Sequence, residues 1–265
     1  MTTARFRDLL AAEWIKLWSL RSTSWLIGLG TLAIVGFAAN SSLDAYNSWP
    51  DFTEMEKARF TPLNEAFSAL AASMLVIGAG SLGALTIVGE YTTGLIRTTL
   101  AAVPARHRVV AAKLTVTAAV TLATGTLISA GTFGVSQAIL SGRGVAASLG
   151  DPGVLRVLAA NALLAPVSAL VGMGIGALVR HTAAAVVTVC AALVIVPTFF
   201  KPTVHQWQND LFALVPFYVW RNCLHLPQLR DDPALPTVAG SWAVFALWPL
   251  AAAVATLIVV QRRDV

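Results

Sequence analysis

The sequence predicts an all-α integral membrane protein with six transmembrane helices. Only 12% of its 265 residues are charged and the mean hydropathy is +0.73, whereas a soluble domain carries about 25% charged residues. Six stretches contain no Asp, Glu, Lys or Arg, and each approaches or exceeds the roughly 20 residues that a helix needs to cross a bilayer. These runs are 22–43, 66–89, 114–142, 157–179, 182–200 and 233–261. The segments between them are short, so we expect one membrane domain, 1–265, and no separate soluble domain.

Residues 5–21, ahead of the first run, read as an amphipathic helix lying in the headgroup region. Apolar residues recur there at spacings of three and four. They are Phe6, Leu9, Leu10, Trp14, Leu17 and Trp18. Glu13 breaks this pattern because it falls on the apolar side. It either pairs with Lys16 at the helix edge, which we favour, or makes a buried contact with basic residues of the segment 90–113.

The segment between the second and third runs reads as a short helix with few charges. It begins at Glu90 and closes at Pro104, a residue that helix interiors reject. A new helix is expected to begin near Ala105 and continue through Lys113 into the third run. A short helix held between two spans could transmit force, but its position alone fits an ordinary basic loop equally well. Glu90 is then either an exposed acid beside Arg97 and Arg106 or a buried group that orients this segment.

The third and fourth runs carry packing signals. The third contains seven hydroxyl residues, which in membranes usually bond to their own helix or pack against a neighbour. In the fourth, Gly172 and Gly176 form a small-xxx-small pair that allows helices to approach closely. Arg180 follows in a tight inner turn before the fifth run. Between the fifth and sixth runs, residues 211–220 are apolar but too few to cross a bilayer, so we expect a re-entrant or interfacial element.

The distribution of basic residues orients the chain. With six spans and a cytoplasmic N-terminus, the inner segments hold 11 Lys and Arg residues and the outer segments hold 7. This excess predicts that both termini lie in the cytoplasm and that the protein resides in the cell membrane. The pI of about 9.7 therefore reflects membrane topology, and we expect no nucleic-acid partner.

Motifs for built-in catalysis are missing from the sequence. It has no GxxxxGK[ST] phosphate cradle, no HExxH and no G-x-S-x-G elbow. None of the six runs contains a charged residue of the kind that proton-coupled carriers keep as a relay. Cys223, His225 and Asp231 are too few and too scattered to predict a metal site. We expect no catalytic residue, cofactor or metal in this chain.

Three segments together resemble the permease subunits of type-2 ABC exporters, a family of bacterial drug-export and lantibiotic-immunity permeases. They are 12–21, 89–100 with Pro104 and Lys113 following, and 172–182. The string Glu90-Tyr91-x-x-Gly94-x-x-Arg97-Thr98-Thr99-Leu100 is the most specific of the three. With the six-span count, the resemblance covers nearly the whole chain except the outer loops.

The resemblance implies a membrane subunit that depends on partners. A separate cytoplasmic ATPase, present in two copies, would bind ATP and Mg²⁺. A second permease chain, identical or paralogous, would complete the substrate path. A coupling helix, here Glu90 to Leu100, would dock on the ATPase, with the helix before the first span packed nearby. The residues implied are Glu90, Tyr91, Gly94, Arg97, Thr98 and Thr99 for coupling; Glu13, Trp14, Lys16, Trp18 and Arg21 for the interfacial helix; Gly172 and Gly176 for packing; and Arg180 at the inner turn.

Alternative functions stay open on the sequence. A substrate-capture subunit of an importer also has about six spans and no ATP site, although it would not be expected to carry the Glu90-Tyr91 string. An intramembrane enzyme is disfavoured by the missing motifs, and a structural membrane partner is a further possibility. Uncharged spans favour an apolar or amphipathic cargo, and lipid, drug and peptide all fit.

Overall fold

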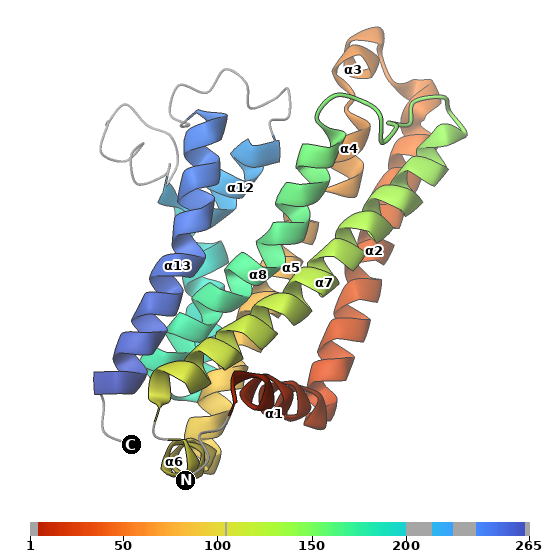
Figure 1. Ribbon diagram of the computed structural model, residues 1–265. Coiled ribbons are helices and arrows are strands. Elements are labelled where there is room, and N and C mark those ends of the chain that lie inside the picture. Colours follow the sequence, from red (N-terminus) through yellow and green to blue (C-terminus); the bar gives the residue numbers. More distant parts are fainter. Residues whose placement is uncertain (1–4, 104, 200–213, 225–236, 263–265) are drawn as a thin grey trace.

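The protein is a bundle of long helices, five of which are apolar and long enough to cross a membrane (Figure 1). The computed structural model describes residues 5–103, 105–199, 214–224 and 237–262, and no strand occurs in these ranges. The predicted class, an all-α membrane protein, is therefore confirmed. The five helices are α2 (Arg21–Ser48), α5 (Ala69–Thr93), α7 (Arg106–Ser141), α8 (Val154–Val179) and α13 (Val238–Arg262).

The fifth predicted span, 182–200, corresponds to a segment of mixed helical geometry. It consists of α9 (Thr182–Cys190), the π-helical turn η2 (Ala191–Ile195) and α10 (Val196–Phe199). Its apolar part, Thr182–Ile195, is shorter than the other five candidates, and residues 200–213 lie outside the described part of the chain. The count of six spans therefore stays a prediction.

The helices alternate in direction, so both described ends of the chain lie at the same end of the bundle (Figure 1). There α1 (Phe6–Ser19) lies across the long helices, and α6 (Leu95–Ala102) lies beyond the end of α5. Arg106, at the start of α7, donates hydrogen bonds of 3.4 and 3.5 Å to the carbonyls of Val260 and Gln261 near the end of α13. The short helices η1 (Trp49–Asp51), α3 (Glu54–Arg59), α4 (Pro62–Ala66) and α12 (Pro216–Leu224) lie at the opposite end.

Helix α8 is the centre of the bundle and packs against α5, α7 and α13. Small residues bring α8 and α5 into backbone contact: Gly172 faces Gly80, and Gly176 faces Ala84. A Cβ added at Gly172 would overlap the backbone of Gly80, so no larger residue fits there without a shift. The small-xxx-small pair thus lies at the α8–α5 contact, where close approach maximises van der Waals packing.

The hydroxyl groups of α7 behave as the sequence predicts. Five threonines donate to the carbonyl four residues earlier in the same helix, and Ser129 donates to the carbonyl of Leu158 in α8 at 2.9 Å. The threonines are Thr115, Thr121, Thr124, Thr126 and Thr132. These bonds satisfy polar groups where water is absent, so the hydroxyls do not form a polar path by themselves.

The helices extend beyond the charge-free runs, which corrects one expectation and agrees with another. Helix α5 continues to Thr93 rather than ending at Gly89, and α7 begins at Arg106, as expected from Ala105. The ends of these long helices therefore include Glu90 and Lys113. The charge-free runs therefore lie within longer helices, and the residues at which each span enters and leaves the membrane stay a prediction. Of the expected element at 211–220, the structure describes Leu214 onward, mainly as α12, and 211–213 lie outside it.

Candidate functional site

Four charged side chains from three helices meet at the end of the bundle where α1 lies. They are Glu13 and Lys16 of α1, Glu90 of α5 and Lys113 of α7, and we call them the charge cluster. Lys16 Nζ lies 2.8 Å from Glu13 Oε1 and 2.7 Å from Glu90 Oε1. Lys113 Nζ lies 2.5 Å from Glu13 Oε2 and 3.0 Å from Glu90 Oε1. Each lysine thus bridges both carboxylates.

The charge cluster is buried and formally neutral. Glu13 is 5% exposed, and Glu90 and Lys113 are each 6% exposed, whereas the Lys16 side chain keeps 32% of its surface accessible. A charge is costly to bury unless it is paired and hydrogen-bonded. Two ammonium and two carboxylate groups meet this condition, and Lys113 donates a further bond of 3.4 Å to the carbonyl of Thr86.

Lys16 remains protonated in this setting. Burial alone lowers the pKa of Lys16, but hydrogen bonds to Glu13 and Glu90, together with attraction by both carboxylates, outweigh burial and raise it above the ordinary value of 10.5. Lys16 is therefore a fixed positive charge at physiological pH, and it is the member of the charge cluster most open to other molecules.

The packing of α1 explains how Glu13 reaches the interior. Leu9, Glu13 and Leu17 recur every four residues and form the buried face of the helix. Leu17 packs against Val116 and Val120 of α7. Trp14 and Trp18 are 50% and 39% exposed, so they lie outside this buried face, and their expected place in the headgroup region stays a prediction. Residue Arg21 is also exposed and begins α2 outside the charge cluster.

The structure tests the alternatives that the sequence left open for Glu13 and Glu90. Glu13 makes both of the contacts considered, with Lys16 on its own helix and with Lys113 from the segment 90–113. The reading of Glu90 as an exposed acid beside Arg97 and Arg106 is wrong, because Glu90 is buried and binds Lys16 and Lys113.

The expected coupling segment divides into two parts at Gly94. Glu90 and Tyr91 belong to α5, and only the residues after Gly94 form the short helix α6, which corrects the single helix expected from Glu90 to Leu100. Gly94 has φ +71°, a left-handed conformation that glycine adopts readily, and it ends one helix and begins the next. Arg97 and Thr98 are exposed on α6 and Thr99 is half-buried, whereas Ile96 is buried.

A second contact joins residues that lie far apart in the sequence. The Arg180 guanidinium lies over the Tyr91 ring at 4.3 Å from its centroid, and Arg180 Nη2 donates to the Tyr91 hydroxyl at 3.5 Å. Arg180 itself has φ +56° at the end of α8, and its N–H donates to the carbonyl of Gly176. This contact ties the α8–α9 turn to the end of α5, and no local pattern predicts it.

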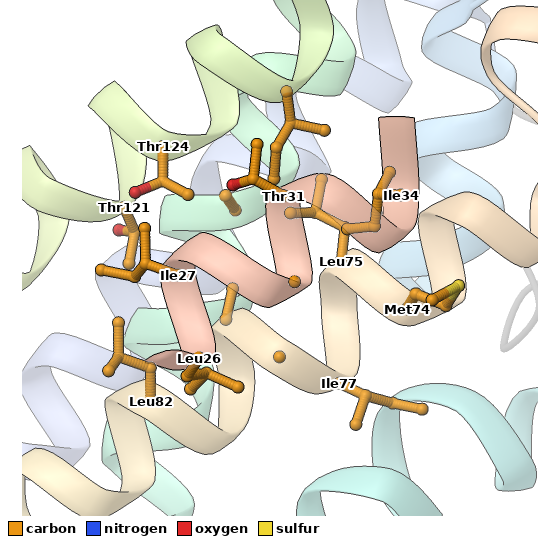
Figure 2. A pocket seen from close by; sticks show the side chains of 15 residues that line it. Leu26, Ile27, Thr31, Ile34, Met74, Leu75, Ile77, Leu82, Thr121 and Thr124 are labelled. Atoms are coloured by element: carbon orange, nitrogen blue, oxygen red, sulfur yellow. The ribbon is translucent and has the colours of Figure 1, made fainter. Parts of the chain in front are cut away.

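Two cavities lie beside these elements, and the sequence does not predict either. A cavity of about 380 Å³, lined by the charge cluster together with mostly apolar surface, borders α1, α2, α5 and α7. An apolar cavity of about 330 Å³ lies farther along α2, α5 and α7 (Figure 2). Leu26 and Leu82 line both cavities, so the two spaces adjoin.

Metal-binding groups are not assembled in the part of the chain that the structure describes. No three or more His, Cys, Asp or Glu residues gather there in a way that could hold an ion. Cys223 lies buried in α12, and the other two residues considered with it, His225 and Asp231, lie outside the described residues.

Comparisons with known proteins give no family assignment. No protein-family model matches the chain, and no curated protein matches it. The geometry of the charge cluster, of α6 and of the cavities is thus the basis for the function proposed below.

Proposed function

We propose that the chain is the membrane-spanning permease subunit of an ATP-driven ABC exporter and works with a separate cytoplasmic ATPase. The observation that carries this proposal is the position of α6. This short helix connects α5 to α7 and lies beyond the end of the bundle (Figure 1). Its Arg97 and Thr98 are exposed. A partner that docks on such a helix and displaces it would move both connected spans, α5 and α7.

The charge cluster supports this proposal because it links the elements around α6. Glu90 lies one turn before Gly94 in α5, and Lys113 lies two turns into α7. Both bind α1 through Glu13 and Lys16. A push on α6 would therefore move the ends of α1, α5 and α7 together, as in rigid-body transitions between inward-open and outward-open states.

The remaining parts of the assembly are those that the family resemblance implies. Because the chain has no GxxxxGK[ST] phosphate cradle, ATP and Mg²⁺ would bind the ATPase subunit, of which we propose two copies. A second permease chain, identical or paralogous, would complete a substrate path at a two-fold interface. In this arrangement the complex lies in the cell membrane of a bacterium, and the end with α1 and α6 faces the cytoplasm.

Crosslinking tests the docking of α6 directly. Arg97→Cys and Thr98→Cys should each form a disulfide with cysteines placed on a co-expressed ATPase subunit encoded beside this chain. Met55→Cys is the matched control, because it is 66% exposed but lies at the opposite end of the bundle. Crosslinks at Met55→Cys and none at α6 would contradict the proposal.

Transport direction separates the exporter from the substrate-capture subunit of an importer. Inside-out vesicles that hold both subunits should accumulate an amphipathic dye when ATP is added. An importer would instead require ATP on the face opposite to its substrate and would not accumulate dye in these vesicles. A structural partner would show neither effect.

A further inference from the structure

The two cavities are neighbours between α2, α5 and α7. Leu26 of α2 and Leu82 of α5 line both of them and lie where the two spaces adjoin. The charge cluster lines the first cavity, and Ile34, Met74 and Ile128 are among the residues that line the second. Figure 2 shows Ile34 and Met74 in the second cavity. We call the two adjoining spaces together the α2–α5 groove.

Charged side chains line only one end of the α2–α5 groove, and both ends have mostly apolar walls. The end beside α1 contains the charge cluster and several hydroxyl side chains, whereas the far end is lined almost wholly by aliphatic side chains. Two of its three threonines, Thr121 and Thr124, already donate their hydroxyl hydrogens to carbonyls of α7. A molecule that fills the groove therefore needs a charged head and an apolar tail.

The dimensions of the α2–α5 groove fit one leaflet of a membrane. Along α7, its lining extends from Lys113 to Ile128, which corresponds to about 22 Å at 1.5 Å per residue. Half of a bilayer, with its headgroup region included, measures about 20–22 Å. Each cavity also lies within the 300–1,000 Å³ that is usual for ligand sites.

The surroundings of the groove place it in contact with the bilayer. Helix α2 is the least buried of the five long helices, and its flanks expose large apolar side chains such as Trp25, Leu29 and Leu32. A molecule dissolved in the bilayer can therefore approach beside α2. The charge cluster lies at the level of α1, at the end of the bundle, where lipid headgroups are expected.

We propose that the α2–α5 groove binds one phospholipid with a zwitterionic headgroup. One of its two acyl chains enters the apolar cavity, the other lies in the bilayer beside α2, and its headgroup lies against the charge cluster. Lys16 uses two of its three N–H donors within the charge cluster, which leaves one for the lipid phosphate. Both bonds to Glu90 use Oε1, so Oε2 can accept from the lipid ammonium. Two lysines and two glutamates match a headgroup of zero net charge, and this inference does not depend on the proposed function.

Two glycines allow the groove to be blocked without disturbing the fold. Gly30 and Gly78 line the apolar cavity, and a Cβ added at either meets nothing within 4 Å. Gly30→Leu and Gly78→Leu should therefore project into the groove. Gly28→Leu and Gly36→Leu are matched controls, because they lie on α2, have equal room for a Cβ and line neither cavity.

The experiment uses the full chain in nanodiscs that contain phosphatidylethanolamine with a diazirine in its acyl chain. After illumination, mass spectrometry locates the crosslinked peptides. We expect crosslinks concentrated on groove residues of α2, α5 and α7, and a loss of at least fivefold in Gly30→Leu and Gly78→Leu but not in the two controls. All variants are first checked for monodispersity and for unchanged thermal unfolding.

Three results would overturn the proposal. Crosslinks spread equally over α13, whose Leu247 and Leu250 are exposed, would indicate general bilayer contact. Undiminished crosslinking in the Gly30→Leu variant would place the lipid elsewhere. A disulfide between two copies carrying Gly30→Cys, with no lipid crosslink, would show that a second copy fills the groove.

Competition with unlabelled lipids tests the headgroup, and a substitution at Thr31 tests whether the occupant of the apolar cavity is apolar. Unlabelled phosphatidylethanolamine should compete with the photolipid more strongly than anionic phosphatidylglycerol, and the reverse order would refute the zwitterionic assignment.

Thr31→Val should leave crosslinking unchanged, although the Thr31 hydroxyl lines the groove and has no hydrogen-bond partner among the described residues. A large loss in that variant would instead indicate a polar occupant that bonds to this hydroxyl.

Discussion

Pairing with opposite charges determines how much each member of the charge cluster contributes to the stability of the fold. The two carboxylates are almost fully buried and share the same two lysines. Because a buried charge without a partner is strongly destabilising, the removal of one member costs more than the pair itself contributes. The exposed pair of Lys57 with Glu54, whose nitrogen–oxygen distance is 3.1 Å, provides a comparison in the same chain.

Removal of the Glu90 charge should destabilise the junction of α1, α5 and α7. Glu90→Gln leaves Lys16 and Lys113 with one carboxylate, and an unpaired buried charge typically costs about 3–5 kcal/mol. We expect normal membrane insertion, a lower midpoint of thermal unfolding, and, in the proposed assembly, a joint fall in transport and ATP hydrolysis. Size-exclusion chromatography after heating measures the midpoint.

Glu54→Gln is the control for Glu90→Gln, because the Glu54 side chain is 92% exposed and pairs only on its own short helix. It should leave the unfolding midpoint unchanged. A wild-type midpoint and wild-type transport in Glu90→Gln would show that the buried pairing of Glu90 has no role.

Alkaline pH should weaken the docking of α1 through Lys16. The pKa of Lys16 is raised in the folded protein, so its contribution to stability is complete below the ordinary value of 10.5 and declines as pH rises through the folded value. The difference in unfolding midpoint between wild type and Lys16→Gln should stay constant from pH 7 to 9 and shrink above pH 10.5. A difference that shrinks between pH 7 and 9 would contradict the raised pKa.

At the scale of elements, small residues set how closely the helices approach. Helices α5 and α8 touch through their backbones at Gly80, Gly83 and Gly172. In a membrane such contacts replace the hydrophobic driving force that soluble helices use. The same contact positions Glu90 and Tyr91 at the end of α5 relative to Arg180 at the end of α8.

A methyl group at this contact should separate the two helices. Gly172→Ala places a Cβ against the backbone of Gly80, and such overpacking costs about 1–3 kcal/mol. Gly36→Ala is the control, because a Cβ there meets nothing within 4 Å, and it should be neutral or slightly stabilising through helix propensity. Thermal unfolding in one detergent compares the two variants, and an equal midpoint in both would contradict the tight contact.

At the scale of the whole molecule, α1, α6 and the end of α13 share one end of the bundle (Figure 1). Basic residues concentrate in the segments expected at this end, among them Arg97 and Arg106. Positively charged segments remain on the cytoplasmic side during insertion. The opposite end carries the acidic segment around Glu54 and Glu56.

Cysteine labelling in intact cells should assign the two ends. In a cysteine-free background, Asp51→Cys should react with an impermeant maleimide from outside, and His107→Cys should react only after permeabilisation. Both positions are exposed, so accessibility within the protein is matched. The reverse pattern would invert the topology.

The sequence by itself determined the class of this protein and most of its helices. Runs without charges predict membrane helices because the bilayer selects for apolar length, and hydroxyl side chains in α7 bond locally, as a helix in lipid requires. The string around Gly94 also predicted a short helix there, although its start was placed at Glu90 rather than after Gly94.

Only the tertiary structure decided which partners come from distant parts of the chain, whereas the contact of Glu13 with Lys16 was expected from the sequence. Glu13 lies 100 residues from Lys113, and Tyr91 lies 89 residues from Arg180. No local pattern encodes these pairs, because each depends on how α1, α5, α7 and α8 cross. The α2–α5 groove has the same origin: residues of α1, α2, α5 and α7 line it, and the space between these helices exists only once they have packed around small residues.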